Sequence, residues 1–184
     1  MTKMRGFAIR GVLKYVKHSD FPGGVPALAK GLSPDVAATY ENEIQRGEWY
    51  PYPVYEEMLK AVCDRIGTGE PEFMAEVGLF TSQFEGNTMF ELFSGQTTVE
   101  RLLRNAAPLW QMYCDTGAFE TEVGDGTLKA ILRGFPDISP YHSNLLPGWI
   151  RGMGKAAGAS SGTVTMQTIF SRGEDCCVYH ATWK

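Results

Sequence analysis

The spacing of apolar residues changes once along this chain, close to Gly117, and this change constrains the fold more than any other feature. Before it, apolar side chains recur every three or four residues, as over residues 9–16, so they share one face of a helix. After it they alternate with polar ones, as over residues 128–132, so they share one face of a strand. We therefore expect helices first and a sheet afterwards.

The first part of the chain predicts five helices separated by segments rich in glycine and proline. Pro34 directly follows Ser33, which is typical of a helix start because proline fits the first helical position. Residues 47–53 contain prolines and aromatic residues and are interpreted as a loop. The predicted helices cover residues 9–16, 33–47, 54–66, 70–86 and 98–113, with a short helical turn at 26–30.

The second part predicts an antiparallel sheet with one helix inserted. A turn sequence, Gly124-Asp125-Gly126, joins two alternating segments, which is typical of a hairpin. A helix over 145–157 and two strands over 163–170 and 176–183 follow. We therefore expect an α+β fold in which a helical N-terminal two-thirds packs on a C-terminal antiparallel sheet. The absence of a linker or repeat predicts a single domain over 1–184.

The composition excludes several classes of protein. The 43% hydrophobic content of this 184-residue chain excludes a disordered protein. The net charge of -4 argues against a nucleic-acid partner, and no apolar run is long enough for a membrane span. The N-terminus lacks the pattern of a signal peptide, so we expect a cytoplasmic protein with reduced cysteines.

The motifs of the common hydrolases and nucleotide-binding proteins are missing from the sequence. An enzyme would have to use His142 with a carboxylate within reach, such as Asp137. On the last predicted strand, Cys176 and His180 share a face and Cys177 lies on the other. A zinc ion would need further ligands, and the sequence supplies no obvious pair, so metal binding by these residues is left open and no metal site is assigned.

Aromatic residues are abundant, at 12% of the chain, and they cluster in the helical part. They could fill a solid core, or they could line an apolar ligand pocket between helices and sheet. The sequence does not separate these two interpretations. The residues proposed for a ligand pocket are Trp49, Tyr52, Phe80, Phe84, Trp110, Trp149 and His142.

Several segments together resemble a known superfamily. They are WYPYPVYEEML, APLWQMYCDTG, the glycine-rich LLPGWIRGMG and the final GEDCCVYHATW. The chain resembles the bacterial heme-NO-binding-like and 4-vinyl-reductase domain superfamily. This resemblance implies a helical half on an antiparallel sheet, often dimeric, around a small-molecule pocket. Its members sense aromatic or other hydrophobic ligands, assist assembly in tetrapyrrole pathways, or sense gases through heme.

The chain departs from the superfamily at two sets of ligands. Zinc-binding members end in a pair of cysteines; here the later position is Cys177, the earlier one is occupied by Phe170, and the upstream ligand cysteine is absent too. Heme-binding members use a proximal histidine on a helix and a tyrosine-serine-arginine triplet, and neither appears here. The resemblance therefore assigns no cofactor with confidence and leaves an unknown hydrophobic ligand.

Two functions follow as expectations. The first is a non-enzymatic small-molecule-binding or sensory domain with an apolar, aromatic-lined pocket, acting as a homodimer. The alternative is a protein-interaction or assembly module with a solid core and no ligand, which would show a large apolar surface patch. The glycines of the late helix are compatible with a close dimer contact or with close packing of that helix on the sheet.

Overall fold

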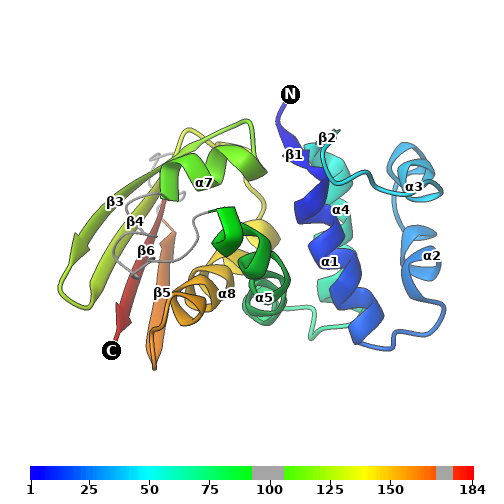
Figure 1. The fold of residues 1–184 in the computed structure, drawn as a ribbon. Coiled ribbons are helices and arrows are strands. Elements are labelled where there is room, and N and C mark those ends of the chain that lie inside the picture. Colours follow the sequence, from blue (N-terminus) through cyan, green and yellow to red (C-terminus); the bar gives the residue numbers. More distant parts are fainter. Residues whose placement is uncertain (93–105, 169–175) are drawn as a thin grey trace.

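The computed structural model describes residues 1–92, 106–168 and 176–184. Its helical part comes first in the chain, as the apolar spacing predicts (Figure 1). The predicted helix over 98–113 is described only from residue 106 onward, and the rest of it lies outside the described residues. The helical elements of this part are α1 (Gly6–His18), α2 (Gly24–Ala29), α3 (Pro34–Tyr40), α4 (Tyr52–Arg65), a single 3-10 turn (Pro71–Phe73), α5 (Met74–Leu92) and α7 (Ala106–Tyr113).

The C-terminal part is a four-stranded antiparallel sheet in the order β3-β4-β6-β5. The predicted hairpin forms β3 (Ala118–Gly124) and β4 (Thr127–Arg133). The inserted helix, α8 (Pro140–Ala156), connects β4 to β5 (Gly162–Thr168), and β6 (Cys176–Trp183) pairs with both β4 and β5. This arrangement confirms the expected α+β class.

The structure also contains a small sheet that the sequence does not predict. Residues Trp49–Pro51 form β2, which pairs antiparallel with β1 (Lys3–Arg5). The segment 47–53 was expected to be a loop because of its prolines. A strand of three residues has no alternation to detect, and its partner lies more than 40 positions away, so only the folded chain shows the pairing.

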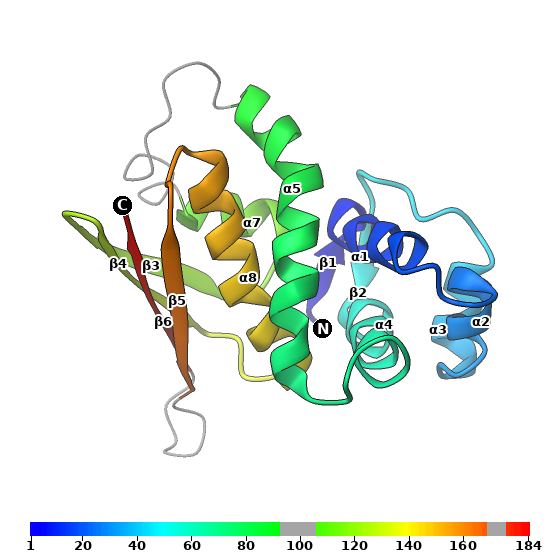
Figure 2. The ribbon, with the colours of Figure 1, turned by 90° about the horizontal axis from the view of Figure 1, so that it is seen from below.

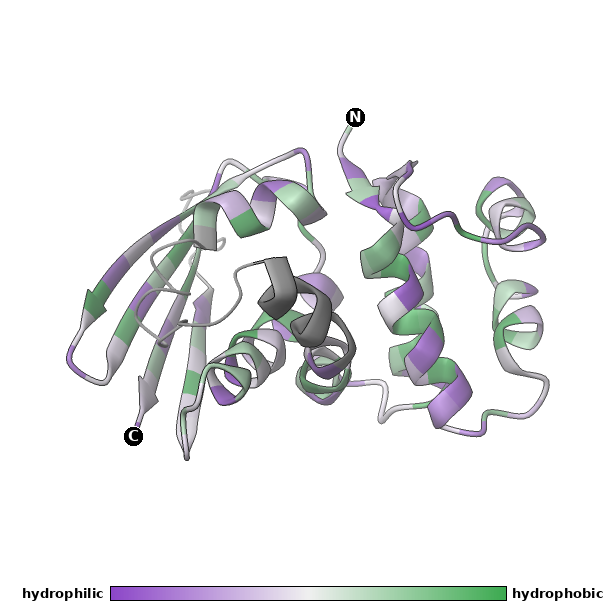
Figure 3. Cartoon of the chain, in the orientation of Figure 1, coloured by the Kyte–Doolittle hydropathy of each residue, from purple (hydrophilic) through white to green (hydrophobic). Residues whose placement is uncertain are grey.

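Helices α5 and α8 lie side by side between the sheet and the N-terminal helices, as two views at right angles show (Figures 1 and 2). Apolar residues recur along α1 and α4 with polar residues between them, and they alternate with polar residues along the strands (Figure 3). The buried core is continuous from α1 and α4 through α8 to β4 and β6. Tyr179 on β6 ties the sheet to α8, because its hydroxyl donates to the carbonyl of Ser143 at 3.2 Å.

The glycines of α8 serve its contact with α5. A Cβ atom at Gly148 would lie 1.7 Å from the carbonyl oxygen of Ala75, and one at Gly78 would lie 2.0 Å from that of Leu145. Only glycine lets the two helix backbones approach so closely. Gly148 of the glycine-rich helix therefore packs against α5. These glycines give no reason to expect a dimer here, and the homodimer stays a prediction.

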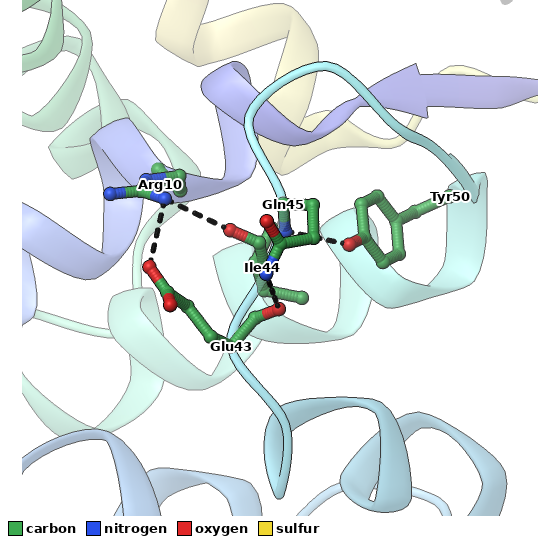
Figure 4. A network of polar contacts seen from close by, with 5 residues as sticks. All are labelled: Arg10, Glu43, Ile44, Gln45 and Tyr50. Carbon is green, nitrogen blue, oxygen red and sulfur yellow. Dashed lines mark hydrogen bonds and ion pairs between the residues drawn. The ribbon is translucent and has the colours of Figure 1, made fainter.

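Helix α3 ends at Tyr40, whereas the sequence predicts a helix that continues to about residue 47. The loop that replaces its last turns is fixed to α1 (Figure 4). Arg10 Nη1 donates to Glu43 Oε1 at 3.1 Å and to the carbonyl of Ile44 at 3.2 Å. The amide of Gln45 donates to the hydroxyl of Tyr50 at 2.8 Å. These contacts hold the backbone of the loop, and Ile44 is buried although it lies in that loop. An apolar residue at helical spacing, such as Ile44, therefore does not by itself imply that the helix continues.

Helix α8 begins five residues earlier than predicted. Ser139 is its N-cap, with Pro140 in the first turn, and Ser139 Oγ accepts a hydrogen bond from the amide of His142 at 3.2 Å. Serine before proline is a favourable start for a helix. The earlier start places His142 in the first turn of α8, whereas the helix predicted from the sequence begins only at residue 145. Within the part of the chain described, none of the helices is long and apolar enough to cross a bilayer.

Candidate functional site: an aromatic cavity beside His142

An apolar cavity lies between α8, α7 and the sheet. Its walls include Trp110 from α7, Phe119 from β3, and Leu146, Trp149 and Met153 from α8. The free volume is about 50 Å³. One water molecule needs roughly 10–15 Å³, and an engineered apolar cavity of about 150 Å³ holds benzene. The cavity as it stands therefore has room for a molecule of a few non-hydrogen atoms.

His142 lies in the wall of this cavity and is almost completely buried, with 2% of its surface exposed. Its Nδ1 is 3.2 Å from the hydroxyl of Tyr52 on α4. The same hydroxyl oxygen accepts the amide hydrogen of Ser139 at 3.1 Å. Tyr52 therefore joins α4 to the first turn of α8 and fixes one edge of the imidazole, which leaves Nε2 as the ring nitrogen that could meet a ligand.

Aromatic rings surround the imidazole of His142. The ring of Trp110 is stacked on it at a centroid distance of 5.8 Å. Tyr55 meets it edge-on at 5.1 Å and Phe135 at 5.9 Å. Burial among these rings lowers the pKa of His142 to about 3, because the charged imidazolium would lose its hydration. The imidazole is therefore neutral at physiological pH and acts as a hydrogen-bonding group.

The structure does not pair His142 with the carboxylate that an enzymatic role would need. Asp137 is exposed, whereas the contacts of the His142 ring nitrogen run to Tyr52. Burial raises the pKa of Tyr52 above its ordinary value, so its phenol also stays neutral. The buried polar groups at this site therefore form a neutral network rather than a proton-transfer pair.

Trp149, another residue of the cavity wall, carries an unpaired polar atom. Its indole Nε1 is sealed from solvent and has no hydrogen-bond acceptor, which is true of no other buried side-chain nitrogen or oxygen among the described residues. The corresponding atom of Trp110 is satisfied, because it donates to the carbonyl of Thr116 at 2.8 Å. Buried polar groups nearly always have partners, so the unpaired indole of Trp149 calls for an explanation.

The residues proposed from the sequence occupy different places. Trp110, Trp149 and His142 come together in the cavity wall, and Tyr52 contacts His142. The other three are placed elsewhere or not described. Trp49 lies under the guanidinium of Arg5 at 3.8 Å, Phe80 stacks on His18 at a centroid distance of 4.8 Å, and the side chain of Phe84 lies outside the described residues.

Most of the α8 residues that line the cavity were not among the site residues predicted from the sequence. Leu145, Leu146, Ile150 and Met153 line the cavity together with His142 and Trp149. Their spacing of three or four residues is that of one helix face. The pattern could have been extended back to His142 from the Ser139-Pro140 start signal, which is visible in the sequence.

The described residues contain no cluster of three or more histidine, cysteine, aspartate or glutamate side chains that could hold a metal ion. On β6, Cys177 is buried and His180 is exposed, in agreement with the opposite faces expected from the strand alternation. The side chain of Cys176 lies outside the described residues.

A second hollow lies at the other end of α8, against β5 and β6. It has a free volume of about 160 Å³ and is more polar, with Arg151, Lys155 and Ser160 in its wall. The apolar cavity is the stronger candidate for a ligand site, because its wall is predominantly apolar and aromatic and includes the buried imidazole of His142.

The fold and the cavity together define an α+β domain with an aromatic-lined cavity between helices and sheet. The particular fold is that of the H-NOX domains. An H-NOX protein from S. oneidensis in the Fe(II)NO ligation state superposes with a TM-score of 0.75 at 9% sequence identity, over 98% of this chain and 99% of that one. Fe(II) unliganded H-NOX from K. algicida gives a TM-score of 0.75 at 10% identity, over 98% and 97% of the chains.

An oxygen-binding H-NOX domain related to soluble guanylate cyclases, in its oxygen complex, gives a TM-score of 0.69 at 14% identity, over 98% of this chain and 95% of that one. No protein-family model and no curated protein matches the sequence. At these identities the likeness shows the fold, and it confirms the H-NOX-like half of the resemblance seen in the sequence. The structures named here are all H-NOX proteins, so the likeness to 4-vinyl reductases stays a prediction.

Proposed function

We propose that this chain is a non-enzymatic sensory domain that binds a small apolar molecule in the cavity between α7, α8 and the sheet. The observation that carries the proposal is the cavity itself, which is lined by aromatic and aliphatic side chains and has a neutral, buried imidazole in its wall. Pockets of this composition are typical of small-molecule sites. The H-NOX neighbours, which include structures with NO and oxygen, support a ligand-binding role for the fold.

Helix α8 gives such a domain a means of reporting its ligand. One face of α8 forms much of the cavity wall, while Gly148 packs against the backbone of α5. Because the two helices touch through their backbones, a shift of α8 on ligand binding would move α5 as well. The signal would then pass from the cavity to the N-terminal helices.

Heme does not fit the described residues. The chain has only three histidines, and two of them lie away from the cavity: His18 stacks on Phe80, and His180 is exposed on β6. The third, His142, is enclosed by rings beside a free volume of about 50 Å³. No lysine or arginine stands among the described residues of the wall to meet the carboxylates of a porphyrin. We therefore propose a ligand smaller than heme, although H-NOX neighbours were solved with iron in the Fe(II) state.

The alternative of a protein-interaction module has no comparable support. Such a module would present a large apolar patch. Among the described residues, Met1 is the one large apolar side chain that is strongly exposed.

The proposal is tested by blocking the cavity. Ala130 on β4 lines it, whereas Ala181 on β6 is also buried but lines the second hollow. Ala130→Val should fill the cavity and Ala181→Val should leave it open. The probe is isobutene, and the readout is the urea midpoint with and without it. We expect isobutene to stabilise the wild type and Ala181→Val but not Ala130→Val.

Equal stabilisation of all three proteins, or of none, would overturn the proposal. Hemin is titrated in parallel and followed by its absorbance. Stoichiometric binding with a sharp Soret band that Ala130→Val abolishes would show that heme is the ligand. It would overturn the proposal of a ligand smaller than heme.

A further inference from the structure

The imidazole of His142 has one ring nitrogen that the protein leaves without a hydrogen bond. Nδ1 contacts the hydroxyl of Tyr52 at 3.2 Å, and Nε2 has no such partner among the described residues. Nε2 is nevertheless not sealed off. Among the described residues that are not exposed, Trp149 Nε1 is the one unpaired side-chain nitrogen or oxygen that free space does not reach. Nε2 of His142 therefore borders free space, which the indole nitrogen does not.

The free space beside Nε2 is the apolar cavity. His142 is one of the residues that line this cavity, and 2% of its surface is exposed. The little accessible surface of His142 therefore lies inside the protein. Nδ1 is turned towards Tyr52 of α4, which leaves Nε2 as the ring nitrogen on the cavity side.

The hydrogen bonds of Tyr52 indicate that Nε2 carries the proton of the neutral imidazole. The phenol oxygen already accepts the amide hydrogen of Ser139 at 3.1 Å. The phenol hydrogen then has two acceptors within reach, His142 Nδ1 at 3.2 Å and Ser139 Oγ at 3.4 Å. Nδ1 is the closer one, and Ser139 Oγ already accepts from the amide of His142. Because a neutral imidazole has one donor and one acceptor nitrogen, a hydrogen bond accepted by Nδ1 makes Nε2–H the donor.

We propose that His142 Nε2–H donates a hydrogen bond to the ligand of this cavity, and that the ligand is a small, uncharged carbonyl compound with an apolar body. This inference rests on the proposed function, because it names the class of molecule that the same cavity takes. A carbonyl oxygen accepts the hydrogen bond and brings no donor of its own into the apolar wall. A pure hydrocarbon would leave Nε2–H unpaired.

The wall disfavours a charged ligand, and the free volume excludes a large one. No lysine, arginine, aspartate or glutamate stands among the described residues that line the cavity. Burial lowers the pKa of His142 to about 3, so the imidazole supplies no charge at physiological pH either. A carboxylate or an ammonium group would lose its hydration there without gaining a partner of opposite charge. The free volume of about 50 Å³ admits a few non-hydrogen atoms.

Nuclear magnetic resonance of His142 tests the inference without changing the cavity. The chain has three histidines, and His18 and His180 are exposed, so His18→Gln and His180→Gln together leave His142 as the single histidine. Nitrogen-15 labelling then shows which ring nitrogen carries the proton, and we expect Nε2. Acetone and isobutene are the probes, because they have nearly the same shape and the carbonyl oxygen of one is a methylene group in the other. We expect acetone to move the Nε2–H signal downfield and isobutene to cause no hydrogen-bond shift.

The affinities for the two probes give a second readout. We expect His142→Leu to weaken acetone binding roughly three- to tenfold and isobutene binding by less than about twofold, because only acetone loses a hydrogen bond. Trp149→Phe is the matched control in the same wall. Free space does not reach the indole nitrogen that it removes, so this substitution should change both affinities by the same factor.

The outcomes separate the two proposals. If both probes bind and His142→Leu weakens them equally, the cavity is a ligand site and the role of His142 is overturned. An Nε2–H signal that acetone does not move has the same meaning, and it requires no variant of His142 to fold. A proton on Nδ1 instead of Nε2 overturns the donor and with it the carbonyl class. If neither probe binds the wild type, both the carbonyl inference and the proposed function are overturned.

Discussion

Gly148 on α8 lies so close to Ala75 on α5 that a Cβ atom at position 148 would be 1.7 Å from the carbonyl oxygen of Ala75. A methyl group cannot be accommodated there unless the backbones separate. We expect Gly148→Ala to destabilise the protein by about 2–3 kcal/mol or more, in the range of a strongly overpacked core. Urea denaturation measures this difference.

Gly154, on the same helix, is the matched control. A Cβ atom at Gly154 would meet nothing within 4 Å. Because alanine is the better helix former, Gly154→Ala should be neutral or stabilising by up to about 1 kcal/mol. Equal effects of the two substitutions would show that the close contact between α5 and α8 is not formed in solution.

The pH dependence of stability should carry the signature of His142. Burial lowers the pKa of His142 to about 3, from 6.5 in the unfolded chain. The unfolded state therefore binds a proton first as the pH falls. The stability contributed by neutral His142 is complete above pH 6.5 and is lost progressively towards pH 3. The slope is about 1.4 kcal/mol per pH unit within that window.

The slope is measured against a variant without the titrating group. His142→Asn keeps a polar atom near the position of Nδ1 and cannot be protonated. The free energy of unfolding of the wild type minus that of His142→Asn should be constant above pH 7 and should fall between pH 6 and pH 4, a range within the His142 pKa shift. A difference that does not change with pH would mean that His142 is solvated in the folded protein.

The hydroxyl of Tyr52 should matter more than that of Tyr50. Tyr52→Phe removes the oxygen that accepts from Ser139 and contacts His142 Nδ1, both of them buried. Leaving these groups unpaired is expected to cost about 1–3 kcal/mol. Tyr50→Phe removes an exposed hydrogen bond from Gln45, where water can substitute, and should cost less than about 1 kcal/mol. Thermal or urea unfolding of the two variants measures the loss of stability that each substitution causes. A similar loss for both variants would contradict the buried network.

The thiols of Cys63, Cys114 and Cys177 should be unreactive in the folded protein. All three are buried, and burial raises the pKa of Cys114 to about 12. Because the thiolate is the reactive form, a buried thiol reacts slowly. The measurement uses Ellman's reagent on Cys176→Ser, which removes the fourth cysteine. We expect three equivalents to react in urea and less than about one within minutes under native conditions. Fast native reaction of all three would contradict their burial.

Local sequence patterns were sufficient to predict the order of most helices and strands. The alternation of Leu128, Ala130 and Leu132 predicts β4, and the spacing of Val12 and Val16 predicts part of α1. These predictions succeed because neighbouring residues alone decide which face of a helix or strand is apolar. The start of α8 was predicted too late, although the Ser139-Pro140 signal is local.

The candidate site could be predicted only in part. The sequence singled out aromatic residues, but it could not tell Trp110, which lines the cavity, from Trp49, which lies under Arg5. Their difference arises from which distant segment each one meets.

The sequence by itself determined the α+β class, the place of the change from helices to strands, and the division of β6 residues between two faces, because these depend on the periodicity of residues close together in the chain. The tertiary structure decided that Trp49–Pro51 is a strand, that Gly148 faces Ala75, and that Tyr52 holds His142. Each of these joins segments more than 40 residues apart, and which segments meet is fixed by the packing of the whole core.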